Sequence, residues 1–215
     1  ALYREDSPGA LALVQESFLV LGGNYNVTKN LGVYHIYSNA GGDEINRFFL
    51  PLNSTGEVRG AHSSFVTDAE AAGEGQDLRI AEKVALRSIP STLDNLTAVY
   101  GVSMYDSNLD PVPIMRNEEL MLIYAEASIQ TGALQQGLDV LNQIRTGNNL
   151  AAYAGPVTRE ALLDEMLKQR RYSLFMEAHR WIDMRRYGRL GQLPLDRTGD
   201  DVWESFPLPF AENEA

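Results

Sequence analysis

The chain has 215 residues, of which 18 are Lys or Arg and 29 are Asp or Glu, so its formal net charge is −11. This surplus of acids argues against binding to a nucleic-acid backbone, whose phosphates need basic partners. Cysteine is absent, which excludes disulfides, thiol chemistry and zinc–thiolate sites, and no apolar run approaches the roughly 20 residues of a membrane-spanning helix.

The first predicted element is a helix over residues 8–21. Ser7 can cap its start, Pro8 suits the first helical turn, and Gly22 can end it. Its apolar residues at helical spacing are Leu11, Val14, Phe18 and Leu21. Such a stripe predicts a helix that packs on a core.

From residue 22 to residue 75 the pattern is short and irregular. We expect brief strands at 33–37 and at 47–52, the second at a sheet edge because Pro51 lacks a backbone N–H. The candidate ligand contacts in this part are Tyr25, Tyr34 and Tyr37. Aromatic rings stack on apolar sugar faces while neighbouring amides and hydroxyls bond sugar hydroxyls, so these residues suit carbohydrate. The alternative is that the rings attach a loop-rich segment to the core.

Metal and cofactor sites are not expected. The histidines lie far apart in the chain, at His35, His62 and His179. This spacing does not match zinc ligands, and no H-E-x-x-H motif occurs.

Residues 66–116 are predicted to be mostly linking structure. Residues 83–89 alternate in hydrophobicity as a strand does, and Pro90 is expected to end that strand. A loop rich in helix and strand breakers is expected at 106–113, directly before the next helix.

Two adjacent helices are predicted after this loop. Residues 117–131 are almost continuously apolar between Leu120 and Ala125, which indicates a helix buried on most sides. Gly132 ends it, and residues 133–145 carry leucines on one side and polar side chains on the other. The pair predicts an antiparallel hairpin similar in size to a tetratricopeptide unit.

The longest predicted helix covers residues 159–187, which contain neither Gly nor Pro. Its second half mixes strong charges with Trp and other apolar groups, as packed helices with satisfied guanidinium groups do. Glu177 and Arg180 lie one turn apart, as do Asp183 and Arg186, so each pair can meet on the helix face.

Three motifs of the chain are similar to sequences of one family. Residues 177–188, E-A-H-R-W-I-D-M-R-R-Y-G, resemble the E-G-x-R-W-x-D-L-x-R-x-G signature near the end of SusD/RagB proteins. Residues 116–145 resemble the R-x-x-E-x-x-L-x-x-A-E-A…L-N-x-I-R run of the same family. Residues 203–214 resemble its closing F-P-I-P-x-x-E segment.

The chain departs from the family pattern at three positions. Ala178 replaces a Gly, and Gln169 and Ser173 stand where an E-R-R-x-E-L segment has two Glu. Ion pairs that those two carboxylates would make are therefore not carried over to this chain.

The resemblance implies a mainly α fold, with tetratricopeptide-like helical hairpins and a loop-rich insert that contains short strands. On this basis we divide the chain into three parts. Residues 1–23 are a helix that continues an upstream helical array, residues 24–115 are the loop-rich part with short strands, and residues 116–215 are the C-terminal helical region with its closing loop.

The resemblance also implies a function. SusD-like proteins are non-catalytic lipoproteins on the cell-surface side of the outer membrane, and they capture a glycan or another nutrient for a SusC-like TonB-dependent channel. The expected partners are that channel and a small nutrient, with a lipid anchor on an N-terminal segment missing from this sequence. Two alternatives stay open: a tetratricopeptide-like protein-interaction scaffold without saccharide binding, and an enzyme such as a two-carboxylate glycosidase. No local sequence isolates one acid in an apolar pocket, which argues against the enzyme.

The motif residues are expected to be structural rather than ligand-binding. Guanidinium groups in packed helices are usually satisfied by carboxylates or carbonyls. The residues assigned to this role are Arg116, Glu126, Arg145, Glu177, Arg180, Trp181, Asp183 and Arg186.

Overall fold

The structure is a computed structural model that describes residues 1–69, 71–72 and 75–206, so most of the predicted closing segment lies outside the described residues. The α-helices are α1 (Ser7–Gln15), α2 (Tyr25–Thr28), α3 (Ser64–Thr67), α4 (Leu78–Lys83), α5 (Asn117–Gln130), α6 (Leu134–Gly147), α7 (Arg159–Ser173) and α8 (Arg180–Arg186). The strands are β1 (Gly32–His35), β2 (Gly60–Ala61), β3 (Ala71–Ala72), β4 (Gly75–Gln76), β5 (Val84–Leu93), β6 (Leu96–Val102) and β7 (Val112–Arg116). Two 3-10 turns are η1 (Leu2–Arg4) and η2 (Leu190–Gln192).

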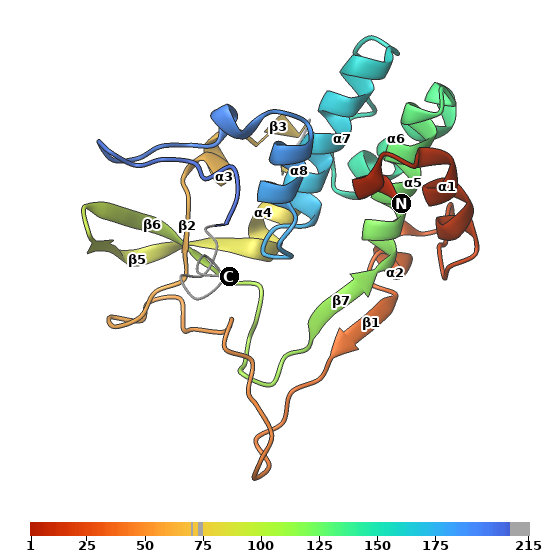
Figure 1. Cartoon of the computed structure of the whole chain (residues 1–215). Coiled ribbons are helices and arrows are strands. Elements are labelled where there is room, and N and C mark those ends of the chain that lie inside the picture. The colour runs from red at the N-terminus through yellow and green to blue at the C-terminus, as the bar shows by residue number, and fades with distance from the viewer. Residues whose placement is uncertain (70, 73–74, 207–215) are drawn as a thin grey trace, which may run out of the picture.

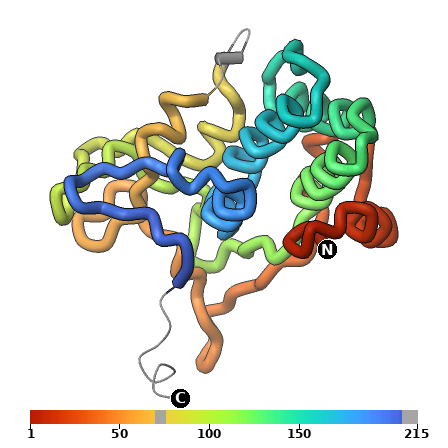
Figure 2. Tube along the Cα trace, turned by 45° about the horizontal axis from the view of Figure 1, so that its top comes forward, coloured from red at the N-terminus to blue at the C-terminus, as the bar shows by residue number. Residues whose placement is uncertain are grey.

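The long helices lie on one side of the molecule and the largest sheet lies on the other (Figure 1), an arrangement that a second view also shows (Figure 2). α5, α6 and α7 pack together, and α1 packs against α5. The antiparallel sheet has the strand order β2–β6–β5, and a separate ribbon pairs β1 with β7. The mainly α fold with short strands is confirmed. None of the described helices has the length and apolar content needed to cross a membrane.

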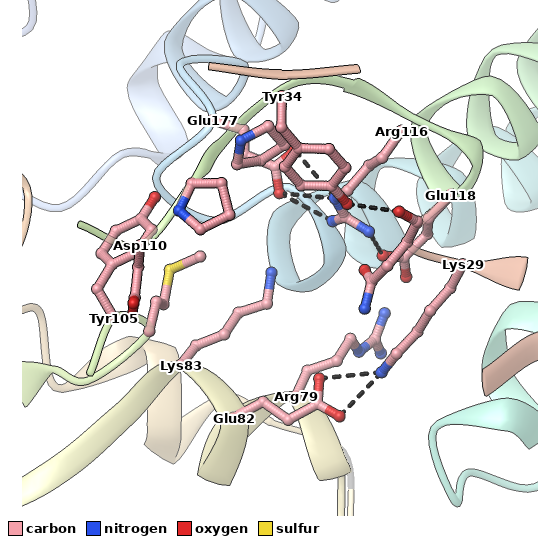
Figure 3. A pocket seen from close by; sticks show the side chains of 14 residues that line it. Lys29, Tyr34, Arg79, Glu82, Lys83, Tyr105, Asp110, Arg116, Glu118 and Glu177 are labelled. Carbon is pink, nitrogen blue, oxygen red and sulfur yellow. Dashed lines mark hydrogen bonds and ion pairs between the residues drawn. The ribbon is translucent and has the colours of Figure 1, made fainter. Parts of the chain in front are cut away.

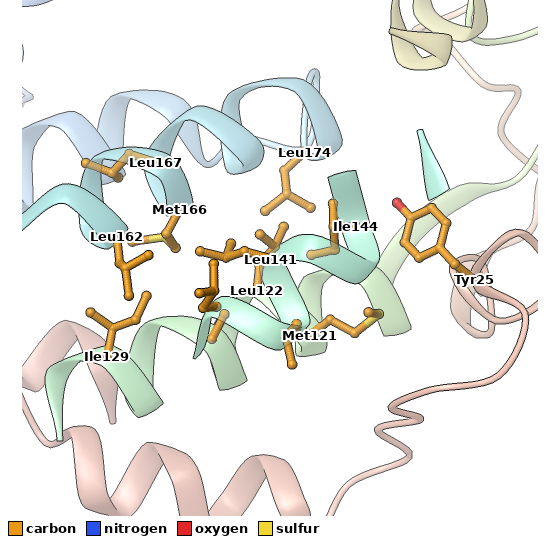
Figure 4. Packing of buried hydrophobic residues seen from close by; sticks show 13 residues of the cluster. Tyr25, Met121, Leu122, Ile129, Leu141, Ile144, Leu162, Met166, Leu167 and Leu174 are labelled. Atoms are coloured by element: carbon orange, nitrogen blue, oxygen red, sulfur yellow. The ribbon is translucent and has the colours of Figure 1, made fainter. Parts of the chain in front are cut away.

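α5 and α6 form the predicted antiparallel hairpin. Eleven of the fourteen residues of α5 are buried, as its continuous apolar run predicts. Gly132 turns the chain with a φ of 89°, which glycine adopts at little cost. Gly137 lets the two helices approach closely, because a Cβ at this position would lie 2.5 Å from Cγ1 of Ile129. Side chains of α5, α6 and α7 meet in one shared core (Figure 4).

The first helix is shorter than predicted. α1 ends at Gln15 rather than near residue 21, and Asp6, not the following serine, caps it by accepting a hydrogen bond from the Gly9 N–H at 2.9 Å. Beyond the helix, Asn117 accepts from the Val20 N–H at 2.7 Å and donates to the Val20 carbonyl at 3.0 Å. Asn117 therefore satisfies backbone groups that a further helical turn would have paired.

The predicted helix over 159–187 is interrupted between α7 and α8. The connecting turn contains two residues in the left-handed region, Met176 with a φ of 65° and Ala178 with a φ of 61°. The expected pairing of Glu177 with Arg180 on one helix face is therefore wrong, since Glu177 lies in the turn.

The interruption has a tertiary cause. The Ser173 carbonyl, which a continuing helix would pair with the N–H of residue 177, accepts instead from Lys83 Nζ at 2.5 Å and from Arg116 Nη2. The Glu177 N–H bonds the Leu174 carbonyl at 3.1 Å. Two cations from distant segments thus replace the next helical hydrogen bond.

β5 continues through Pro90, where the strand was expected to end. Its pairing with β6 shifts register between Leu86 and Ser91, and β5 lies at the sheet edge. A proline is tolerated at such an irregular edge because it interrupts no regular ladder. The hairpin turns at Asp94 and Asn95, with φ values of 52° and 60°, as two-residue hairpin turns require.

The ribbon of β1 and β7 agrees only in part with the expectation. β1 accounts for the strand predicted at 33–37, although it ends at His35. β7 lies partly within 106–113, where a loop leading directly into the helix was expected. The antiparallel pairing places Tyr34 opposite Pro113.

The strand predicted at 47–52 is absent from the structure. Guanidinium groups bond the carbonyls of this segment instead: Arg59 Nη2 donates to the Arg47 carbonyl at 3.1 Å, and Arg87 Nη1 donates to the Leu52 carbonyl. Because side chains satisfy these carbonyls, the segment needs no neighbouring strand.

A second, smaller core fixes α4 against α7. It contains Phe65 from α3, Ile80 from α4, Val84 from β5 and Tyr172 from α7. The ring centroids of Phe65 and Tyr172 lie 5.1 Å apart. This packing brings the C-terminal ends of α4 and α7 together, and the candidate site lies there.

Candidate functional site

The guanidinium of Arg116 joins the ends of β7, α5 and α7. Its Nη2 lies 2.8 Å from Glu177 Oε1, and its Nε lies 3.2 Å from each Glu177 carboxylate oxygen. Nη1 bonds Glu118, and Nη2 bonds the Ser173 carbonyl. Burial lowers the pKa of Arg116, but the carboxylates of Glu118 and Glu177 outweigh it and raise that pKa. Arg116 is therefore fully engaged inside the protein.

A second set of buried pairs holds α8 on α5 and α7. Arg186 Nη2 lies 2.7 Å from Glu126 Oε2 and 3.1 Å from Asp183 Oδ1, so the one-turn spacing of Asp183 and Arg186 does produce contact. Arg170 Nε donates to Asp183 Oδ2 at 2.6 Å. Glu126 is 1% exposed and Asp183 is 2% exposed, so both carboxylates serve as internal counter-ions.

Three further motif residues have different surroundings. Arg145 pairs with Glu165 at 2.5 Å, where both side chains are buried. Trp181 Nε1 donates to the Trp203 carbonyl at 2.9 Å. Arg180 makes no hydrogen bond or ion pair within the part of the chain that the structure describes, and its half-buried position lowers its pKa. Arg180 is thus not held by an ion pair as Arg145 is.

A cavity of about 330 Å³ opens beside Arg116 (Figure 3). Its walls come from β1, α4, β7, the start of α5 and the turn between α7 and α8. Four basic side chains, four acidic side chains and two tyrosines line it. The volume falls in the lower part of the range of about 300–1,000 Å³ that small-molecule sites occupy.

α4 supplies the basic wall of this cavity. Asp77 begins the helix by accepting from the Arg79 N–H at 3.0 Å, and its carboxylate also pairs with the Arg79 guanidinium at 2.7 Å. Lys83 ends the helix, and its Nζ donates to the same Ser173 carbonyl as Arg116. Burial, and then repulsion by Arg116, lowers the pKa of Lys83 to about 8.

A further wall of the cavity carries phenol and carboxylate groups. Tyr34 donates its hydroxyl hydrogen to the Asn30 carbonyl at 2.6 Å. Burial, reinforced by Glu177, raises the pKa of Tyr105 to about 12, so this phenol keeps its proton at neutral pH. Asp110 accepts from the Ser107 hydroxyl at 2.7 Å, and this bond is the main cause of its lowered pKa. The wall therefore offers both donors and acceptors.

The three candidate tyrosines lie in different places. Tyr25 is 4% exposed and belongs to the main core, and its hydroxyl bonds Glu118 and the Asn148 amide. A ring so enclosed has no face left for a ligand. Tyr25, which was predicted to contact the ligand, is therefore a core residue. Tyr34 lines the cavity. Tyr37 lies outside that lining, with its ring centroid 4.5 Å from that of His35.

Reasoning from sequence missed the residues of α4 and of the loop before β7 that line the cavity. One signal was available, because the chain has three lysines in all and two of them, Lys29 and Lys83, line this cavity. Clusters of His, Asp and Glu able to hold a metal ion do not occur among the described residues.

The sequence model of the SusD family matches residues 95–208, which is 114 of the 215 residues of the chain. The chain therefore belongs to the SusD family. A search of curated proteins gave no match.

Solved structures share this fold. A SusD superfamily protein from Bacteroides vulgatus has a TM-score of 0.58 at 21% identity, over 89% of this chain and 50% of that chain. One from Parabacteroides distasonis has a TM-score of 0.56 at 20% identity, over 86% of this chain and 46% of that chain. This chain thus spans about half the length of the proteins that it resembles, and identity at this level establishes the fold alone.

Proposed function

We propose that this chain is part of a non-catalytic protein that binds a glycan or a similar small polar nutrient in the cavity beside Arg116. Membership of the SusD family supports a nutrient-binding role. The observation that carries the proposal is the cavity itself, in which fixed cations, carboxylates and phenols face one another. Each sugar hydroxyl both donates and accepts hydrogen bonds, so a mixed lining of this kind suits a saccharide.

Two tyrosines are the proposed contacts for the apolar face of a sugar. Tyr34 and Tyr105 both line the cavity, together with charged side chains. An aromatic ring offers a flat apolar surface with a polar tip, which matches the two kinds of surface on a pyranose. Tyr37 is proposed as a contact for a longer ligand that extends past β1.

A glycan array followed by calorimetry on the best binder tests the proposal. Tyr105→Ala should weaken binding about two- to tenfold, because loss of an aromatic contact costs about 0.5–1.5 kcal/mol. Tyr3→Ala is the matched control, since this exposed tyrosine near the first helix does not line the cavity. A protein that binds other proteins but no saccharide would support the scaffold alternative instead.

The partner and the location are also proposals. We infer that the whole protein works on the cell-surface side of the outer membrane, held by a lipid anchor, and passes its nutrient to a SusC-like TonB-dependent channel. Co-purification of such a channel with the tagged full-length protein from membranes tests the partnership. Labelling with radioactive palmitate tests the anchor. Turnover of a bound glycoside, abolished by substitution of one cavity carboxylate, would contradict the non-catalytic role.

A further inference from the structure

Lys83 is a buried cation whose hydrogen-bonding capacity is largely unused. It is 6% exposed, and its ammonium points into the cavity among the labelled side chains (Figure 3). An ammonium group has three N–H donors. Within the described residues Lys83 makes one hydrogen bond, from Nζ to the Ser173 carbonyl at 2.5 Å. Two donors therefore remain for a group inside the cavity.

The other cations that line the cavity have carboxylate partners. Lys29 pairs with Glu82 at 2.8 Å, and Arg79 pairs with Asp77 at 2.7 Å. The arginine at the end of β7 has the two glutamates described above. Lys83 has hydrogen-bonded contact with a carbonyl but no ion pair with any carboxylate of the described residues. Among the four cations of this lining, Lys83 is thus the one without an ion pair among the described residues, although Glu118 and Glu177 act on its charge from a greater distance.

A buried ammonium without a direct ion pair is costly, because the lost hydration is only partly replaced. The lowered pKa of Lys83, whose first cause is burial, expresses this cost. At pH 7 the group still carries its proton, since its pKa of about 8 lies above that pH. An anion that enters the cavity would supply the missing partner.

We propose that Lys83 receives a singly charged anionic group of the ligand, so that the cavity selects acidic saccharides. The ionic group would be a uronic carboxylate or a sulfate ester, which share one negative charge and oxygen acceptors. Glu118 and Glu177 line the same cavity, and their charges oppose entry of a more highly charged group. This inference rests on the proposed function and specifies the class of saccharide.

Paired ligands that differ in charge alone test the inference. Calorimetry would compare oligogalacturonides with their methyl esters, and sulfated galactose oligosaccharides with the unsulfated ones. We expect at least one acidic member to bind tenfold or more tightly than its neutral counterpart. Equal affinity of both members, or preference for the neutral member, overturns the inference but leaves the proposed function standing. If none of the four ligands and no member of the glycan array binds, the inference and the proposed function are both wrong.

The variant Lys83→Met keeps the length of the side chain and removes its charge. It should abolish the preference for the acidic ligand, whereas Lys29→Met, which removes a cation already paired with Glu82, should keep it. Circular dichroism confirms that each variant is folded. If Lys83→Met keeps the full preference for the acidic ligand, another residue recognises the negative charge of that ligand and the inference is wrong.

The pH dependence of the unmodified protein gives a test that needs no variant. The charged groups that act on Lys83 are Arg79, Arg116, Glu118 and Glu177, and the arginines keep their charge through this range. Above pH 8 the free protein loses the Lys83 proton, so affinity for the acidic ligand should fall up to about tenfold per pH unit. Affinity for a neutral saccharide should not follow this course. A flat profile for the acidic ligand contradicts the inference.

Discussion

Several buried charges in this protein form ion pairs that join different elements. Arg116 binds Glu118 and Glu177, and Asp183 binds Arg170 and Arg186. Loss of one member leaves the other charged and buried, which costs far more than the loss of an exposed pair. Single carboxylates therefore control the stability of whole helix junctions.

Asp183→Ala should lower the free energy of unfolding by about 3–5 kcal/mol, because Arg170 loses its buried counter-ion and Arg186 loses one of its two. Ligand affinity should not change, since Asp183 does not line the cavity. Urea unfolding and calorimetry measure the two quantities. Glu44→Ala is the control: its side chain is 69% exposed in a pair with Arg47, so the effect should stay below about 1 kcal/mol. Lost binding with an unchanged unfolding curve would make Asp183 a ligand residue.

Lys83 should make stability depend on pH in the alkaline range. Burial lowers its pKa from 10.5 to about 8, so between these values the unfolded chain holds a proton that the folded chain has released. Stability therefore rises with pH across this window. Between pH 7 and pH 10.5 the free energy of unfolding of the wild type should rise by roughly 3 kcal/mol more than that of Lys83→Met, at about 1.4 kcal/mol per pKa unit. Urea unfolding of both proteins at several pH values measures it, and a constant difference would exclude a depressed pKa.

At the scale of elements, the turn between α7 and α8 decides the geometry of the site. It releases Glu177 from the helix so that this carboxylate reaches Arg116 on the end of β7. Ala178 in this turn has a φ of 61°, a conformation that disfavours every residue with a Cβ. The related family signature has Gly at this position, which agrees with the left-handed turn.

Ala178→Gly should therefore raise the free energy of unfolding by about 1 kcal/mol, because glycine adopts the left-handed region without strain. The side chain is exposed, so no packing is lost. The same change at Ala161, inside α7, should lower stability by about 0.5–1 kcal/mol. Thermal and urea unfolding measure both variants. A loss of stability at position 178 would show that the turn is not left-handed there.

At the scale of the whole molecule, α4 connects the sheet to the helical part. Arg79 is 1% exposed and reaches from α4 to α7, where its Nη1 lies 2.9 Å from Ser173 Oγ and 3.4 Å from the Gln169 carbonyl. Its counter-ion, Asp77, is the residue that caps the start of α4. The two halves are thus joined by polar contacts beside the cavity as well as by the small core around Tyr172.

Arg79→Met should weaken this connection. The free energy of unfolding should fall by about 3–5 kcal/mol, because Asp77 keeps a buried charge without a partner. Hydrogen exchange should quicken more in β5 and β6 than in α5 and α6, whose core does not involve α4. Arg59→Met is the control, since this arginine is partly exposed and pairs with the exposed Glu57. Equal acceleration of exchange in all these elements would show that the molecule opens as one unit.

The local sequence pattern was sufficient to predict the structure wherever neighbouring residues determine it. The α5–α6 hairpin followed from its apolar periodicity and from Gly132, and three ordered motifs indicated the SusD family before any coordinates. The residues of the cavity could not be predicted in this way. Lys83, Tyr105 and Glu177 are far apart in the chain, and nothing in the residues next to them indicates that they meet.

The sequence by itself thus determined the family, the mainly α class and the long helices, because helical periodicity and motif spacing are local properties. Tertiary structure alone decided where α1 and α7 end, since Asn117, Lys83 and Arg116 reach across the molecule to bond backbone groups that a longer helix would have paired. It also decided that Tyr25 is enclosed in the core. The helices end where they do because distant side chains compete for the backbone hydrogen bonds. The periodicity of the sequence carries no information about this competition.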